Sequence, residues 1–277
     1  MTCAPGVTLS LSASTARQGG LLLANLSARA PLTSVLATWD NEKISIWKED
    51  SGATKRPAQW RAFVPVDLEK TPGDYAVAVT AQGNAGEKIA CAITVKVTAG
   101  KFATESLRVA PQFVEPNPEQ LERAKAEQQR LREIYATVTP GKLWHGKFRA
   151  PLDGVISGKN FGRRRVLNGE PSSPHTGVDF PAPTGTAVRA AQAARVVLAE
   201  ALFFAGNTVV LDHGLGVYTL YGHLSEIDAK VGETVAAGAI LGKVGATGRV
   251  TGPHLHWGLT INRSRVNALQ IVQLPAN

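Results

Sequence analysis

Five of the six histidines in the chain lie between positions 175 and 256, in short segments rich in glycine and proline. The first of these segments places His175 four residues before Asp179. Gly177 and the flanking prolines argue against a helix, so we expect an extended segment on which both side chains point the same way. Imidazole and carboxylate are ligand types of hydrolytic zinc sites. An isolated His-x-x-x-Asp pair is more often structural, so it is informative only beside the other histidines.

The second segment, Gly-Pro-His-Leu-His-Trp, contains His254 and His256. Residues two apart on a strand share a face, so both imidazoles are expected to enter the same space while Leu255 faces a core. Two adjacent imidazoles have little structural benefit, whereas a metal or an acid–base reaction would use both. The third segment is an apolar strand that ends at His223, which makes this residue a candidate catalytic base.

Together the three segments offer three metal ligands and two further histidines. Three protein ligands with an open fourth position are typical of a catalytic zinc, whereas a structural zinc site is closed. Water at the open position would have a pKa of about 7, which makes hydroxide available near neutral pH. The remaining imidazoles could then move protons and stabilise charge that develops on a tetrahedral intermediate.

These segments resemble the motifs of the lysostaphin-type (LytM-domain) metallopeptidases over roughly residues 146 to 265, in both order and spacing. The resemblance implies a small antiparallel β domain with a long groove and one zinc ion at its floor. It also implies that His175, Asp179 and His256 are the zinc ligands and that His223 and His254 are catalytic. We interpret the remaining histidines as non-catalytic. For Asn160, Arg163 and Arg165 we expect an ordinary solvated loop, with a place in the lining of the groove as the alternative.

The sequence predicts a mainly β chain with three parts. Residues 1–105 are expected to form an Ig-like β-sandwich accessory domain, because Tyr75, Val77 and Val79 alternate with small residues and turn signals, including one at 51–52, recur along it. Residues 106–145 read as a linker with one amphipathic helix, which begins at the capping sequence Asn117-Pro118 and ends before Pro140. Residues 146–277 are expected to form the LytM-like zinc metallopeptidase domain.

The charge and cysteine content restrict the partners and the compartment. The formal net charge is +8, which favours an anionic partner, but lysine and arginine are scattered without interleaved aromatics, so we do not expect nucleic-acid binding. No apolar run is long enough to span a membrane. Cys3 and Cys91 are equally compatible with one disulfide or two free thiols. We expect a periplasmic or extracellular location, with a signal peptide removed ahead of Met1.

The expected function is hydrolysis of peptide cross-links in bacterial peptidoglycan by a zinc endopeptidase, with a D-alanyl bond to diaminopimelate favoured over a glycine bridge. One alternative is a non-catalytic LytM-like regulator of cell-wall amidases, and another is a wall-binding module that acts through the N-terminal domain. A third is a carrier domain, because the glycine-rich run from Val231 to Gly242 resembles biotinyl and lipoyl hairpins. The complete set of histidines and Asp179 favours the peptidase.

Overall fold

The computed structural model describes residues 1–49, 57–154 and 157–274. The predicted turn at 51–52 lies outside these residues. The chain divides into two compact units, Met1–Gly100 and Lys101–Asn277. Among the described residues, no helix is both long enough and apolar enough to cross a bilayer.

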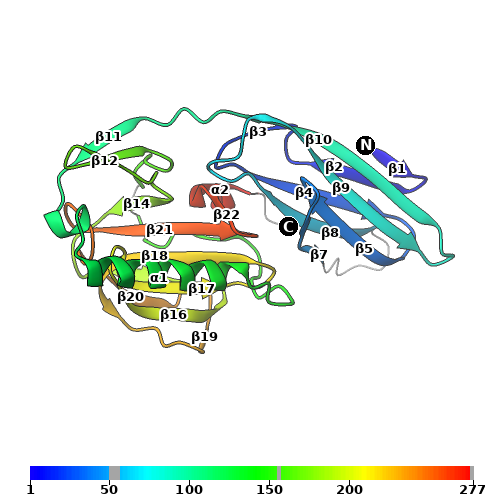
Figure 1. The fold of residues 1–277 in the computed structure, drawn as a ribbon. Coiled ribbons are helices and arrows are strands. Elements are labelled where there is room, and N and C mark those ends of the chain that lie inside the picture. Colours follow the sequence, from blue (N-terminus) through cyan, green and yellow to red (C-terminus); the bar gives the residue numbers. More distant parts are fainter. Residues whose placement is uncertain (50–56, 155–156, 275–277) are drawn as a thin grey trace. The chain divides into compact units, whose positions relative to one another are not determined.

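The first unit consists of strands (Figure 1). Its described strands form two five-stranded sheets, in the orders β1-β2-β4-β8-β7 and β3-β10-β9-β5-β6. Neighbouring strands are antiparallel except for β10 and β3. Val77 and Val79 are buried as their alternation predicted, and they belong to one apolar cluster to which both sheets contribute. The Ig-like topology stays a prediction. The strands are β1 (Thr2–Ala4), β2 (Val7–Leu11), β3 (Thr15–Arg17), β4 (Leu21–Ala28), β5 (Leu32–Trp39), β6 (Glu42–Ile44), β7 (Ile46–Lys48), β8 (Ala58–Pro65), β9 (Gly73–Gly83) and β10 (Lys88–Thr98).

A disulfide joins the two sheets of the first unit. Cys3 on β1 is bonded to Cys91 on β10, which decides between the two states that the sequence left open. The bond closes a loop across a sequence separation of 88 residues. Long loops have a large conformational entropy in the unfolded chain, so the cross-link stabilises the fold by restricting that state.

In its described residues, the second unit contains two sheets, two α-helices and one 3-10 helix. In its described part, a small sheet has the order β11-β12-β13, and the large sheet runs β14-β21-β18-β17-β16-β19, with β15, β20 and β22 attached. Buried residues of β17, β18 and β21 fill the core of the large sheet. The elements are β11 (Thr104–Leu107), η1 (Pro111–Phe113), α1 (Pro118–Ala136), β12 (Arg164–Leu167), β13 (Glu170–Ser172), β14 (Gly177–Pro181), β15 (Ala187–Arg189), β16 (Ala194–Leu202), β17 (Gly206–Asp212), β18 (Val217–Ile227), β19 (Thr234–Val235), β20 (Ile240–Val244), β21 (His254–Ile261), β22 (Ser264–Val266) and α2 (Ala268–Gln273).

Helix α1 begins as predicted, and it packs against the large sheet of the second unit. Asn117 and Gln120 form the expected capping box. The helix lies along the large sheet (Figure 1). Leu131 and Tyr135 pack against an apolar cluster on that sheet, where Tyr135 meets Tyr218 at a ring-centroid distance of 5.5 Å. Residues 101–145 cluster with the second unit, and the first unit ends at Gly100. The predicted division into an accessory domain, a linker and a peptidase domain stays a prediction.

Removing the disulfide should destabilise the first unit. For a loop of this length, Cys91→Ala is expected to lower the free energy of unfolding by about 4–5 kcal/mol, because the unfolded chain regains loop entropy. Hydrogen exchange of the β9 and β10 amides measures this change. Reductant should lower the free energy of unfolding of the wild type by the same amount and should not change that of the variant. Equal protection of the wild-type amides with and without reductant would contradict the expectation.

Candidate metal centre

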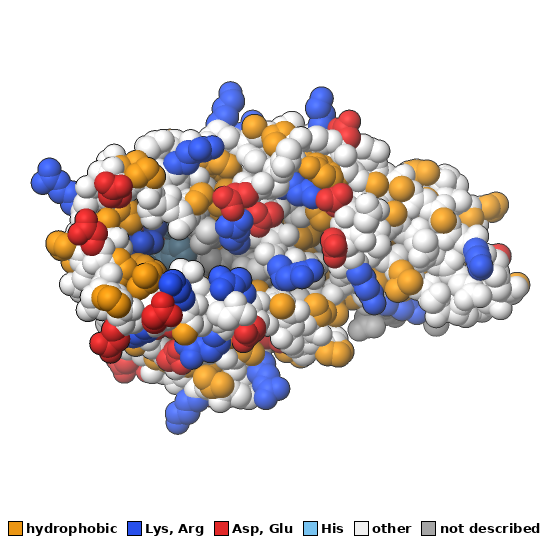
Figure 2. Space-filling view, viewed as in Figure 1, with side chains coloured by type: hydrophobic (Ala, Val, Ile, Leu, Met, Phe, Trp, Pro, Cys, Tyr) orange, Lys and Arg blue, Asp and Glu red, His pale blue; other side chains and the backbone are white. Residues whose placement is uncertain are grey.

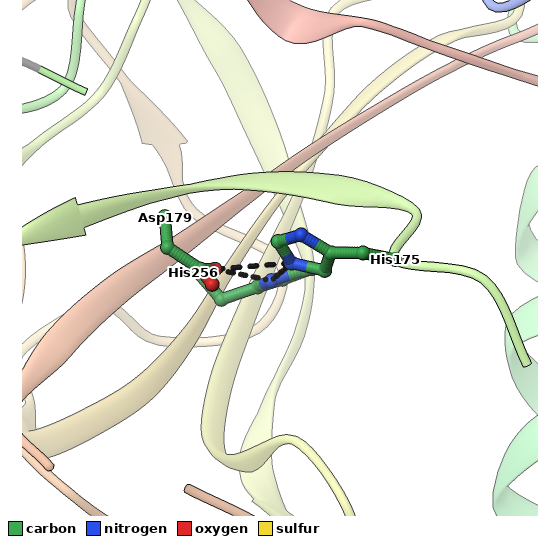
Figure 3. A group of neighbouring side chains, drawn as sticks. All are labelled: His175, Asp179 and His256. Carbon is green, nitrogen blue, oxygen red and sulfur yellow. Dashed lines mark hydrogen bonds and ion pairs between the residues drawn. The ribbon is translucent and has the colours of Figure 1, made fainter. Parts of the chain in front are cut away.

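The large sheet brings the first predicted pair together with His256. Strands β14 and β21 are antiparallel neighbours, and their register places Asp179 directly opposite His256. His175 lies just before β14 and is almost completely buried. Figure 3 shows the three side chains converging from these two segments. Their ligand atoms all lie within 4.8 Å of one another.

The ligand atoms form a tight triangle. His175 Nε2 lies 2.9 Å from His256 Nδ1 and 3.1 Å from Asp179 Oδ1. His256 Nδ1 and Asp179 Oδ1 are 3.0 Å apart. Donor atoms around a tetrahedral zinc ion, each at about 2.0–2.2 Å from the metal, would lie roughly 3.3 Å from one another. The spacing and the chemistry of the donor set therefore fit a small divalent ion.

Hydrogen bonds on the far side of each ligand fix its orientation. His175 Nδ1 donates to the backbone oxygen of Asn160 at 3.0 Å, so the neutral imidazole presents the lone pair of Nε2 to the centre. Asp179 Oδ2 accepts from Asn160 Nδ2 at 2.8 Å and lies 3.5 Å from Arg165. Asp179 therefore keeps Oδ1 for the centre.

The electrostatics keep the carboxylate ionised. Burial raises the pKa of Asp179, but the neighbouring imidazoles of His175 and His256 outweigh burial and hold the pKa well below its usual range. Burial lowers the pKa of His256 to about 4. Neutral imidazole and ionised carboxylate are the protonation states that bind metals.

His223 and His254 form a second pair beside this centre. Their ring centroids are 4.8 Å apart, and the His254 Nε2 atom lies 3.7 Å from Asp179 Oδ1. His223 Nδ1 donates to the Thr247 oxygen at 2.8 Å, and His254 Nδ1 donates to the Gly252 oxygen at 2.9 Å. A carbonyl oxygen can only accept, so each neutral ring keeps an unprotonated Nε2. The two Nε2 atoms are thus available as proton acceptors.

The backbone at His223 is unusual. Its φ is +64°, in the left-handed region that side chains with a Cβ rarely adopt. The backbone N–H donates to Ala205, which holds this conformation. Burial, followed by the neighbouring His256 and His254, lowers the pKa of the His223 imidazole to about 3, so the ring is neutral near neutral pH.

The other two histidines lie away from the centre. His213 is fully buried, with Nδ1 bonded to the Ala193 oxygen and Nε2 2.8 Å from Thr219 Oγ1. Burial lowers its pKa to about 4, as expected for a neutral core histidine. His145 is exposed.

The prediction of a solvated loop for Asn160, Arg163 and Arg165 is wrong. Asn160 bonds both Asp179 and, through its backbone, His175. Arg163 and Arg165 both donate to Glu105, at 2.9 and 3.1 Å, because β11 pairs in parallel with β12 and places Glu105 opposite Arg165. Burial raises the pKa of Glu105, but the two arginines lower it on balance. The basic run at 163–165 was a visible signal, but its partner lies about 60 residues earlier.

Gly177 leaves room for the His256 ring. A Cβ at this position would lie 2.5 Å from His256 Nε2 and 2.7 Å from the Trp257 oxygen. Gly177→Ala should therefore displace the His256 ring and weaken metal binding by about tenfold or more, as a misplaced ligand loses its bond to the ion. Competition with a chromophoric zinc chelator measures the affinity.

Gly258→Ala is the matched control for this prediction. Gly258 is the cross-strand partner of Gly177, but a Cβ there meets only Leu220 Cβ at an ordinary 3.5 Å. We expect its zinc affinity to stay near that of the wild type. Equal affinities for both alanine variants would show that Gly177 has no special role.

Asn160 should support metal binding through Asp179. Asn160→Ala removes one hydrogen bond to the Asp179 carboxylate and one from the Asp179 backbone N–H, and loss of such supporting bonds typically lowers metal affinity by about 10- to 100-fold. The exposed neighbour Lys159 supplies the control variant Lys159→Ala. Unchanged affinity of Asn160→Ala in the same chelator competition would rule out this supporting role.

Comparison with known proteins places this centre in a described family. Residues 173–268 match Peptidase family M23. The chain is 45% identical over 98 residues to peptidoglycan DD-endopeptidase ShyA of Vibrio cholerae, which is 35% of this chain and 23% of the relative. It is 43% identical over 97 residues to the DD-carboxypeptidase/endopeptidase Mpg of Neisseria meningitidis, covering 35% of this chain and 22% of that protein. The chain thus matches about a quarter of the length of these relatives.

A solved structure extends the similarity of fold beyond the matched domain. It is a protein of Pseudomonas aeruginosa assigned as a peptidase M23, with a TM-score of 0.69 and 29% identity. The superposition covers 92% of this chain and 94% of that one. The predicted resemblance to the lysostaphin-type (LytM-domain) peptidases is confirmed for the C-terminal region, which belongs to peptidase family M23.

Proposed function

We propose that the chain is a zinc-dependent endopeptidase that hydrolyses peptide cross-links of bacterial peptidoglycan. The observation that supports this most strongly is the triangle of His175 Nε2, Asp179 Oδ1 and His256 Nδ1 beside the two further imidazoles of His223 and His254. A structural zinc site would surround the ion with four protein ligands, whereas three ligands leave a position for substrate or water. The proposed stoichiometry is one zinc ion per chain.

The proposed roles follow from the position of each side chain. A zinc ion in such a site acts as a Lewis acid and makes water a better nucleophile near neutral pH. His223 and His254 each have an unprotonated Nε2, so one can accept a proton from water and return it to the leaving amine. The other, after taking a proton from solvent, can stabilise negative charge on the carbonyl oxygen. The backbone carbonyls of Thr247 and Gly252 keep both rings in the required tautomer.

The substrate class rests on the relatives and on charge. One similar protein is named a peptidoglycan DD-endopeptidase and another a DD-carboxypeptidase/endopeptidase. Residues 173–268, which carry the site, match Peptidase family M23. A net charge of +8 suits a carboxylate-rich wall. We propose a D-alanyl bond to diaminopimelate as the cleaved cross-link.

The proposed location is the periplasm or the cell exterior. The Cys3–Cys91 disulfide supports it, because such bonds persist in oxidising compartments and are rare in the reducing cytosol.

Digestion of purified cell wall tests the proposal. Wild-type chain should release muropeptide monomers from walls with direct diaminopimelate cross-links, and a chelator should stop the reaction. His256→Ala removes one of three ligands, so we expect activity to fall by about 1000-fold or more and the zinc content to fall from one ion per chain to near zero. Muropeptide chromatography and elemental analysis provide the readouts.

His145→Ala is the control, because it removes an exposed imidazole of the same unit. It should retain wild-type activity and zinc. Walls with glycine bridges, digested in parallel, test the choice of bond. Unchanged products from His256→Ala would exclude the proposed metal centre, and cleavage of glycine bridges alone would exclude the D-alanyl bond.

A further inference from the structure

A cavity of about 310 Å³ opens beside the metal centre. Figure 2 shows a hollow on this face of the second unit, with histidine at its floor and Lys or Arg side chains at its rim. The cavity is lined by His223, His254 and Asp179, by the β11 segment through Glu105, and by the loop that contains Arg249. A substrate that reaches the two histidines therefore passes these charged side chains.

The two arginines of this cavity differ in their partners. Arg165 is paired with Glu105 at 3.1 Å and with Asp179 at 3.5 Å. Arg249 is partly buried, and its guanidinium lies over the Phe204 ring at 4.5 Å from the centroid. In the described part of the chain, the guanidinium of Arg249 has no carboxylate or carbonyl acceptor.

A guanidinium without a protein acceptor in a partly buried position has N–H donors available to an acceptor that a ligand supplies in place of water. Burial and then the charge of Arg165 lower the pKa of Arg249 to about 10, which still leaves it protonated near neutral pH. Stacking on Phe204 holds the guanidinium plane before any ligand arrives, so little side-chain freedom is lost on binding. A guanidinium held in this way matches the two oxygens of a carboxylate.

The charge balance of the cavity also favours an anion. Among the lining residues, the positive charges of Arg165 and Arg249 balance the negative charges of Glu105 and Asp179. A divalent ion at the proposed centre would therefore give the cavity a net charge of +2. A hydrogen bond also holds the backbone of Arg249, because its N–H donates to the backbone oxygen of Phe204 at 2.9 Å.

We propose that Arg249 is a specificity-determining residue that binds a free carboxylate of the stem peptide next to the cleaved bond. This inference rests on the proposed function. Stem peptides with diaminopimelate offer two such groups, the free carboxylate of the D-glutamyl residue and that of diaminopimelate. Both present the same chemistry to Arg249.

Soluble cross-linked muropeptide dimers test the inference with the full zinc-loaded chain. Three substrates are compared: one with both carboxylates free, one amidated at D-glutamate and one amidated at diaminopimelate. Wild type should show a KM about 10- to 100-fold higher for one of the amides, as expected for loss of a charge-assisted hydrogen bond. Arg249→Gln should raise KM for the free acid by a similar factor, leave kcat within about threefold and abolish the preference.

Arg249→Lys separates charge from geometry, since it keeps the charge but loses the planar fork, and it should restore only part of the preference. Arg195→Gln makes the same change of charge at an exposed position on β16 and should leave KM unchanged. Zinc content and the thermal midpoint establish that each variant is folded. Equal KM values of wild type for all three dimers, or an equal effect of Arg249→Gln on all three, would overturn the inference.

A binding measurement separates this inference from the proposed function. Calorimetry with the free tetrapeptide and with its two monoamides does not require hydrolysis. Wild type should bind the free acid about tenfold or more tightly than one of the monoamides, and Arg249→Gln should bind them equally. This preference without any hydrolysis of dimers would disprove the endopeptidase but retain the carboxylate site. Hydrolysis without the preference would disprove only the carboxylate site.

Discussion

Three atoms with lone pairs, His175 Nε2, Asp179 Oδ1 and His256 Nδ1, face one another at separations close to 3 Å in the C-terminal unit. Such atoms repel one another when they are buried, unless a proton or a cation lies between them. A proton can bridge only one pair at a time, whereas a divalent ion can satisfy all three atoms at once. The arrangement is therefore one that a divalent ion would satisfy, as proposed above.

The arrangement depends on features of the sheet and not on the ligands alone. The β14–β21 register sets Asp179 opposite His256, and the lack of a side chain at Gly177 leaves space for the His256 ring. Backbone carbonyls of Asn160, Thr247 and Gly252 orient three imidazoles. Because these carbonyls come from loops, the geometry of the site depends on how tightly the loops pack. A Cβ at Gly248, for example, would lie 2.4 Å from the Gly206 nitrogen, which indicates close packing next to Thr247.

The sequence revealed the chemistry of the site better than its surroundings. Periodicity of two correctly placed His254 and His256 on one face with Leu255 buried behind them, because strand geometry is a local property. Capping residues correctly located the start of α1 for the same reason. The support from Arg165 and Glu105 could not be predicted, since it arises from pairing between β11 and β12, about 60 residues apart. Likewise, the disulfide and the packing of α1 depend on long-range geometry that local patterns do not contain.

Diffraction from zinc-loaded crystals at the zinc absorption edge would locate the ion itself. We predict one anomalous peak per chain, at about 2.0–2.2 Å from His175 Nε2, Asp179 Oδ1 and His256 Nδ1, with no fourth protein ligand. A peak bound by other side chains, or no peak near these three atoms at saturating zinc, would contradict this prediction.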